Sequence, residues 1–195
     1  MTSDEQTLNP EIMVRLKEMT REQHDAVERL FPVFEPTFDR RRYAALLGQL
    51  AQVVFPLEAH LLSLPLPAAF QLPKRLKSAA LLEDLRVLGV EPASAPPAYL
   101  RLPPDVPTAL GALYVLEGST LGGQVLSRQL QARLALTPKR GLRYFSGYGP
   151  QTGAMWLAFG RALRQHVRPG EDLRVIEGAQ QTFAAFECAL TGVSA

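Results

Sequence analysis

The residues of this sequence that could do chemistry begin with a histidine near the N-terminus. His24 is followed four residues later by Glu28, and in a helix this spacing places the two side chains one turn apart. A carboxylate there can accept a hydrogen bond from one imidazole nitrogen and leave the other free to bind a metal. The same spacing fits a half-buried histidine with an ordinary acidic neighbour, so the pair alone leaves both interpretations open.

The supply of metal-ligating side chains limits what His24 could bind. The chain contains three histidines and one cysteine, and a single imidazole is a poor site for zinc, which takes four ligands. One imidazole suffices for haem iron, because the porphyrin supplies the four in-plane donors. Any metal site in this chain is therefore expected to be poor in histidine or to be carried by a cofactor. His60 and His166 lack a partner pattern and are interpreted as surface or packing residues.

A cluster of glycines interrupts the longest predicted helix, 106–134. Gly111, Gly118 and Gly122 are spaced by seven and four residues, so they share one helical face, with Gly123 beside them. Each glycine inside a helix costs roughly 0.5–1 kcal/mol relative to alanine. Either another helix packs unusually close to this face, or a flat ligand lies against the bared backbone.

The elements that must position these residues are predicted to be helices throughout. Apolar residues recur at three- and four-residue spacing, and the alternation typical of strands is nearly absent. The predicted helices span residues 10–30, 39–64 with a kink at Pro56, 73–88 closed by Gly89, 106–134, 151–167 and 172–190. Prolines between 91 and 107 predict an extended connector. We therefore expect an all-α bundle in a single domain, 1–195, in which residues 1–9 form a flexible N-terminal segment.

Composition narrows the class of protein. The length of 195 residues fits one domain, and 21 basic against 19 acidic residues give a formal charge of +2. This balance favours neither nucleic acid nor a membrane as partner. The lone Cys188 cannot form an intramolecular disulfide, which suits a reducing compartment. The N-terminus is polar and acidic and no run of about 18 apolar residues occurs, so we expect a cytoplasmic protein.

Two stretches of the sequence resemble one known family. LKEMTREQHDAVE over residues 16–28 is similar to the proximal helix of haem oxygenases, and YVLEGSTLGGQ over 114–124 is similar to their distal helix. The resemblance is closest to bacterial haem oxygenases that supply biliverdin to bacteriophytochromes, and FSGYG over 145–149 strengthens it. It covers roughly residues 12–190.

The resemblance implies a fold and a haem site. It implies a multi-helix bundle with haem b sandwiched between a proximal helix and a kinked, glycine-rich distal helix. His24 is then the axial ligand of the iron, and Glu28 is its hydrogen-bonding partner. Gly118 and Gly122, with Gly123 beside them, would let the distal backbone cover the porphyrin and leave room for dioxygen.

One departure from the family concerns the distal helix. The better-known animal members carry an aspartate directly after the first distal glycine, where it orders a water chain, and this sequence has Ser119. The resemblance places Ser119 in the catalytic water network together with Gly118 and Gly122. The alternative is a hydroxyl that bonds back to its own helix, and with Thr120 such bonding favours a bend.

Further residues are implied for the rest of the haem. Its propionates need cations or hydroxyls at the pocket mouth. The candidates are Lys17, Arg161, Arg164 and Tyr114, with ordinary solvated helix residues as the alternative. Phe183 on the last helix is expected to wall the haem, although core packing explains it equally well.

The implied reaction is oxidative cleavage of haem at a meso carbon to biliverdin, carbon monoxide and ferrous iron. Haem is both substrate and cofactor, dioxygen is the co-substrate, and an external ferredoxin- or flavodoxin-type donor supplies electrons, because no dinucleotide-binding fingerprint is present. Basic patches at 40–42 and 139–143 are candidate docking sites for this donor or solvated charges. A bacteriophytochrome is the implied downstream partner. The alternative functions are a non-catalytic haem-binding carrier or sensor on the same fold and a haem-free enzyme of that fold.

Overall fold

The computed structural model describes residues 9–92 and 100–192 and is helical over most of that length. No strand forms within these residues, which confirms the all-α prediction. The predicted flexible segment falls mainly on residues 1–8, which lie outside the described part. The helices are α1 Ile12–Met19, α2 Arg21–Arg29, α3 Arg40–Leu62, α4 Ser78–Leu88, α5 Val106–Leu134, α6 Arg143–Ser146, α7 Thr152–His166 and α8 Asp172–Thr191. Short 3-10 turns lie at η1 Pro32–Phe34, η2 Ala68–Phe70, η3 Leu72–Lys74 and η4 Gly149–Gln151.

Local sequence signals account for several helix ends. The side chains of Asp39 and Asp105 accept backbone N–H groups at the N-termini of α3 and α5, as N-cap residues do. Pro107, expected in the connector, instead lies in the first turn of α5, where a missing N–H is tolerated. Gly89 ends α4 at a φ of +71°. Residues 93–99 of the predicted connector lie outside the described residues.

The first predicted helix, 10–30, divides at Thr20 into α1 and α2. Thr20 leaves helical geometry at φ −116° and ψ 6°, and its Oγ1 donates to the carbonyl of Leu16 at 2.7 Å. A threonine hydroxyl that bonds back to the preceding turn competes with the backbone ladder and bends the helix. Lys17 and His24 therefore lie on two helices rather than on one continuous face.

The start of α4 is decided by a residue from another helix. The periodicity predicted a helix from residue 73, but α4 begins at Ser78. The buried carboxylate of Glu58 on α3 accepts the backbone N–H groups of Lys77 and Ser78, at 2.5 and 3.0 Å. It thereby serves as the N-cap that the local sequence lacks.

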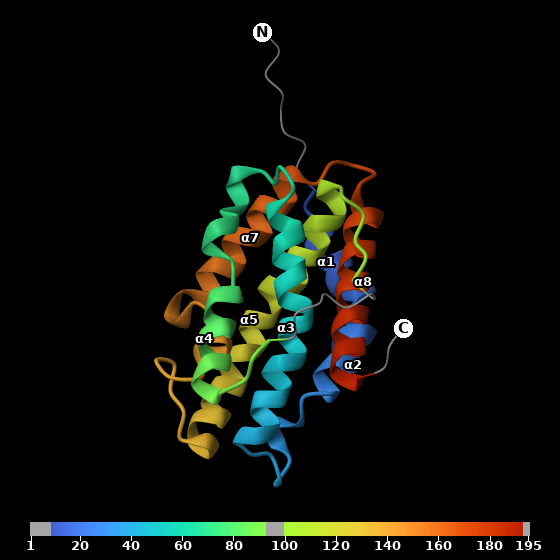
Figure 1. Cartoon of the computed structure of the whole chain (residues 1–195). Coiled ribbons are helices and arrows are strands. Elements are labelled where there is room, and N and C mark those ends of the chain that lie inside the picture. The colour runs from blue at the N-terminus through green and yellow to red at the C-terminus, as the bar shows by residue number, and fades with distance from the viewer. Residues whose placement is uncertain (1–8, 93–99, 193–195) are drawn as a thin grey trace.

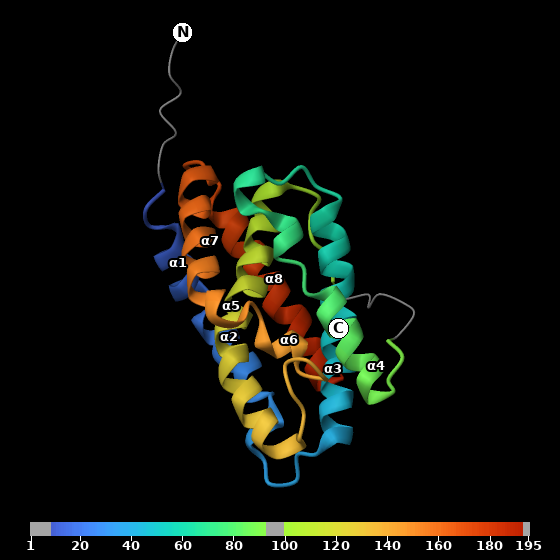
Figure 2. The same cartoon turned by 90° about the vertical axis from the view of Figure 1, so that its left-hand side faces the viewer.

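Helix α8 is the centre of the bundle. It packs against α5, α3, α2 and α1. In Figure 2, α1, α2 and α7 lie along one side of the molecule and α3 and α4 along the other, with α8 between them. Figure 1 shows the helices running roughly parallel to one long axis. Because α2 and α5 both pack on α8, α8 supports the two helices expected to enclose the ligand.

Helix α3 is a core helix. By length and composition it could cross a membrane, with a mean hydropathy of 1.3 over its most apolar stretch, but half of that stretch is buried inside the protein. Leu47, Val54 and Leu61 are fully buried, and the helix continues through Pro56 without ending. Its apolar character is therefore explained by packing against α4, α5 and α8.

Candidate functional site

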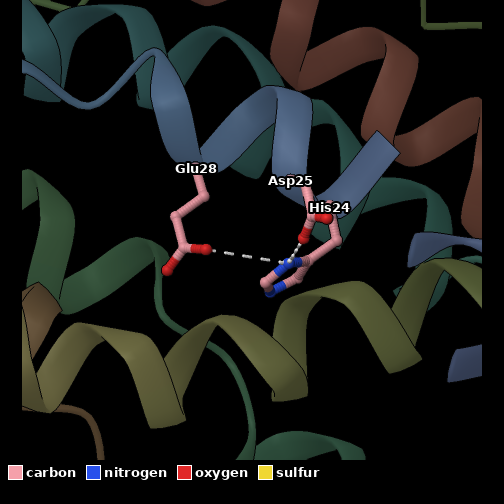
Figure 3. Close-up of side chains that lie close together, drawn as sticks. All are labelled: His24, Asp25 and Glu28. Carbon is pink, nitrogen blue, oxygen red and sulfur yellow. Dashed lines mark hydrogen bonds and ion pairs between the residues drawn. The ribbon is translucent and has the colours of Figure 1, made fainter. Parts of the chain in front are cut away.

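His24 presents an accessible imidazole on α2. Figure 3 shows its ring, with the side chains of Asp25 and Glu28, extending from α2 toward α5. Nδ1 lies 3.3 Å from Asp25 Oδ1 and 4.0 Å from Glu28 Oε2. The imidazole is 58% exposed, and the edge of the Phe183 ring packs near it at a centroid distance of 6.1 Å. The structure thus brings together three residues proposed for the site, His24, Glu28 and Phe183.

Asp25 is a residue that the spacing argument missed. Helical periodicity singles out the i+4 position, but the carboxylate that is within hydrogen-bonding distance of Nδ1 belongs to the next residue. Both acidic side chains are more than half exposed and both reach the same nitrogen. The Nδ1 side of the ring therefore faces negative charge, which favours a proton on Nδ1 and leaves Nε2 as the free ligand atom.

The glycines of α5 divide into two groups. A methyl group added at Gly111 would lie 1.9 Å from the carbonyl oxygen of Val175 on α8, and one added at Gly123 would lie 3.0 Å from the carbonyl oxygen of Phe145. These two glycines permit close packing of backbones. A methyl group at Gly118 would meet only the Trp156 ring at 3.9 Å, and one at Gly122 would meet nothing within 4 Å. Close packing and an open face both occur, at different glycines.

The open stretch of α5 is apolar. Leu121 and Val125 are 40% and 53% exposed, although large aliphatic side chains are normally buried. On a helical projection they lie beside Gly118 and Gly122. Together these four residues give α5 an exposed apolar surface with free space at Gly122, against which the face of a porphyrin could lie.

Gly122→Ala provides a direct test of this surface. We expect the haem-free variant to be more stable by about 0.5–1 kcal/mol, because alanine is the better helix former and its methyl group meets no neighbour. We expect haem to bind about tenfold more weakly, a loss of about 1.4 kcal/mol, because the methyl group takes porphyrin space. Thermal unfolding and haemin titration measure the two effects. Gly153→Ala on α7, which also meets nothing within 4 Å, is the control that should leave haem affinity unchanged.

Tyr114 lies where α5 meets the joint between α1 and α2. Its ring packs against Trp156 at a centroid distance of 5.6 Å. Burial raises the pKa of Tyr114 above its usual value, and a hydrogen bond with Thr20 opposes that rise in part. The phenol is therefore uncharged, and its hydroxyl is already hydrogen-bonded to Thr20.

Ser119 and Thr120 bond back to their own helix. Ser119 Oγ donates to the carbonyl of Leu116 at 2.8 Å, and Thr120 Oγ1 donates to the carbonyl of Glu117 at 2.6 Å. Helix α5 keeps its hydrogen-bonding pattern throughout. In this geometry the Ser119 hydroxyl proton is occupied, while its oxygen can still accept a hydrogen bond from water.

The cations proposed for the propionates are accessible. Lys17 and Arg161 are exposed, and neither has an ion-pair partner within residues 9–92 and 100–192. Arg164 is half-buried beside Gly160, where Met13 of α1 also packs. All three lie on α1 or α7, which pack against each other.

Three of the six basic residues in the patches proposed for donor docking make contacts within the fold. Arg40 donates to the carbonyls of Leu134 and Ala135 at the end of α5. Arg42 pairs with Glu35 at 2.7 Å. Arg143 forms an ion pair with Glu83. Such contacts favour structural roles for these cations.

A buried charged cluster behind α5 was not predicted as a site. Glu117, one residue before Gly118, is 0% exposed and pairs with Arg75, which is 1% exposed, and with Lys77 at 3.3 Å. The Tyr148 hydroxyl donates to Glu117 Oε1 at 2.5 Å. Burial lowers the pKa of Lys77, and burial followed by the charge of Glu117 raises the pKa of Tyr148. The signal that could have found it is a carboxylate within an otherwise apolar and small-residue stretch of α5.

The site as a whole fits a haem. It offers one accessible imidazole, an apolar wall with space that a Cβ at residue 122 would occupy, and an aromatic ring beside the imidazole. A single nitrogen ligand is sufficient when a porphyrin supplies the other donors. The group of His24, Asp25 and Glu28 also has ligand atoms within 4.8 Å of one another.

Comparison with known proteins identifies the family of the chain. The heme oxygenase family model matches residues 11–191. A heme oxygenase of Xanthomonas campestris pv. campestris is 38% identical over 119 residues, which cover 60% of this chain and 68% of that protein.

Solved structures of similar fold include heme oxygenases of Neisseria meningitidis (24% identity, 93% of this chain and 90% of that chain, TM-score 0.74) and Leptospira interrogans (21%, 93% and 99%, 0.77). Heme oxygenase-1 of Synechocystis, solved in complex with heme, is also similar (18%, 93% and 91%, 0.74). The chain therefore belongs to the haem oxygenase family and is an enzyme that degrades haem.

Proposed function

We propose that this chain, as a single domain, binds haem b between α2 and α5 and cleaves it at a meso carbon to biliverdin, carbon monoxide and ferrous iron. The observation that carries the proposal is the accessible imidazole of His24, which extends from α2 toward α5 (Figure 3), together with the open apolar stretch that Gly118 and Gly122 leave on α5. Haem supplies the iron at which dioxygen is reduced and is itself the molecule that is oxidised.

The residues of the chain hold and orient the substrate. His24 would ligate the iron through Nε2, while Asp25 accepts a hydrogen bond from Nδ1 and the Glu28 carboxylate, 4.0 Å away, adds negative charge on the same side of the ring. Gly118 and Gly122 let the α5 backbone lie against the porphyrin, and Phe183 closes the site beside His24. Bound haem would cover the exposed apolar stretch of α5 and so exclude water from that face.

The propionates and the distal water are assigned to polar residues around this wall. Lys17, Arg161 and Arg164 supply positive charge for the carboxylates, and Tyr114 of α5 lines the site. Ser119 accepts a hydrogen bond from an ordered water through its free lone pair. This placement is supported by the exposure of Lys17, Ser119 and Arg161.

The partners follow from the reaction. Electrons must come from a separate donor of the ferredoxin or flavodoxin class, because the chain carries no dinucleotide-binding fingerprint. We assign the protein to the cytoplasm, with neither nucleic acid nor membrane as partner, and a bacteriophytochrome as the acceptor of its bilin product. Co-purification of such an acceptor carrying biliverdin, dependent on this chain, is the result expected.

The test is reconstitution and turnover of the full chain. Haemin titration should give a stoichiometric Soret band, and reductant in air with catalase present should convert that band into biliverdin absorption in the red and release carbon monoxide. Samples without reductant should keep the Soret band. A stable haem complex that does not turn over would identify a carrier or sensor instead. Absence of saturable haem binding would contradict the haem assignment altogether.

A further inference from the structure

The buried cluster behind α5 holds charges that nothing in the proposed reaction uses. Its core is the carboxylate of Glu117, which accepts from Arg75, Lys77 and Tyr148. The segment that carries Arg75 and Lys77 is held from the other side by Glu58 of α3. Two carboxylates and two cations are thus buried together, with balanced charge.

The cluster joins five parts of the chain at one point on α5. Arg75 Nε donates to Phe70 O at 2.5 Å at the end of η2, and Nη1 donates to Met155 O of α7 at 3.3 Å. Lys77 Nζ donates to Tyr148 Oη at 3.0 Å, in the loop after α6. Residues 75–77, α3, α7 and the loop at 148 are therefore all tied to Glu117, directly or through one intermediate residue.

Stability alone does not explain such a cluster. Desolvation of buried charges offsets most of their mutual attraction, and well-packed apolar side chains in their place are often as stable or more so. What a hydrogen-bonded ionic cluster adds over apolar packing is direction: donors and acceptors satisfy one another in one arrangement only. That arrangement sets the position of Glu117, and Gly118 is the next residue.

We propose that Glu117 is a positioning residue, held by Arg75, Lys77 and Tyr148, that fixes the stretch of α5 containing Gly118 relative to α3 and α7. The inference rests on the proposed function for its purpose, because the fixed stretch is the wall against which haem lies. The structural part of the inference, that the cluster fixes the position of α5, applies to the haem-free chain. The cluster acts on the reaction through the backbone of α5 and does not touch the substrate.

The chain contains its own probe for this inference. Trp156 is its single tryptophan, and its ring faces Gly118, 3.9 Å from where a Cβ would lie. Met155, bonded to Arg75, precedes it. Fluorescence quenching of Trp156 by acrylamide therefore reports how tightly α5 and α7 are held at this point, without any ligand.

The experiment compares Glu117→Gln with Asp172→Asn in the full-length, haem-free protein. Asp172 is also buried and paired, with Arg15 and Asn9, but it ties α8 to α1 and residue 9. We expect both variants to lower the unfolding temperature. Only Glu117→Gln should raise Trp156 quenching, by about twofold, and speed amide exchange over residues 114–124 by about tenfold.

A double variant separates position from stability. Lys77→Met in the Glu117→Gln background removes one of the two cations left without Glu117 and leaves one buried cation, Arg75, to balance the charge of Glu58, so the unfolding temperature should recover in part. Quenching and exchange should stay raised, because the Glu117 carboxylate that orients Arg75 is still absent. If both return to wild-type values with the unfolding temperature, the cluster is a stability element and the proposal is overturned.

The other possible outcomes also test the proposal. Equal changes in Asp172→Asn and Glu117→Gln, or none in either, overturn the proposal. If Glu117→Gln does not fold, Tyr148→Phe is measured instead. The same increases in quenching and amide exchange are expected, but smaller. Unchanged quenching in Tyr148→Phe overturns the proposal. In the ferric haem complex, the pH at the midpoint of the pH-dependent absorption change should shift in Glu117→Gln. It should keep its wild-type value in Asp172→Asn. Failure of haem to bind would remove this last readout and leave the haem-free results standing.

Discussion

Gly111→Ala is expected to prevent stable folding. The added methyl carbon would lie 1.9 Å from the carbonyl oxygen of Val175 and 2.7 Å from the backbone nitrogen of Ala179. Both atoms are backbone atoms of α8, so no side chain can move aside. The central helix would have to shift away from α5. Overpacked cores lose about 1–3 kcal/mol and sometimes more, and a clash between two backbones belongs at or beyond the upper end.

Urea unfolding followed by far-UV circular dichroism measures this loss. Because domains are stable by only about 5–15 kcal/mol, Gly111→Ala should unfold at a much lower urea concentration or accumulate as insoluble protein. Gly178→Ala, whose methyl carbon would lie 2.0 Å from the Thr108 carbonyl oxygen, should behave the same way. Gly153→Ala is the matched control with open space. If the urea midpoint of Gly111→Ala equalled that of the wild type, the backbones of α5 and α8 could not be as close at Gly111 as described.

His24→Ala is expected to abolish specific haem binding while leaving the fold intact. The imidazole is more than half exposed and supports little packing, so the unfolding temperature should change little. Loss of the proposed iron ligand should weaken haem binding by at least about a hundredfold, about 2.7 kcal/mol. Haemin titration followed at the Soret band, with circular dichroism of the same sample, measures both.

The carboxylates near His24 provide a graded comparison. Because Asp25 and Glu28 both reach Nδ1, either single change to the amide should have a small effect. Changing both should weaken haem binding by about tenfold, since partners of a metal-ligating histidine typically contribute ten- to hundredfold. His166→Ala, whose ring packs on Phe70 away from α2, is the histidine control. Haem affinity that survives His24→Ala unchanged would exclude His24 as the ligand.

The two glycine interpretations show how far a sequence pattern can be taken. A run of glycines on one helical face indicates that something approaches the backbone, because the cost of glycine must be offset. It does not say what approaches. Gly111 meets the α8 backbone, whereas Gly122 meets open space, and only the path of α8 relative to α5 distinguishes them.

The site residues divide in a similar way. The pairing of His24 with an acid one turn later follows from helical spacing, and the structure places Glu28 within reach. Asp25 came closer to Nδ1 because side-chain rotamers, not helical spacing alone, decide which carboxylate reaches the ring. The break at Thr20 separated Lys17 from the helix of His24, since a hydroxyl bonded back to Leu16 bends the chain there.

The sequence by itself determined what depends on neighbours along the chain. Helical periodicity, the N-caps at Asp39 and Asp105 and the end of α4 at Gly89 are local, and so the all-α class and these helix ends followed from them. The tertiary structure decided what depends on residues far apart in sequence. Glu58 sets the start of α4 from 19 residues away, and Glu117 meets Arg75 across 42. Buried carboxylates meet their partners only when the helices pack, because no local sequence pattern shows which charged groups will be buried next to each other.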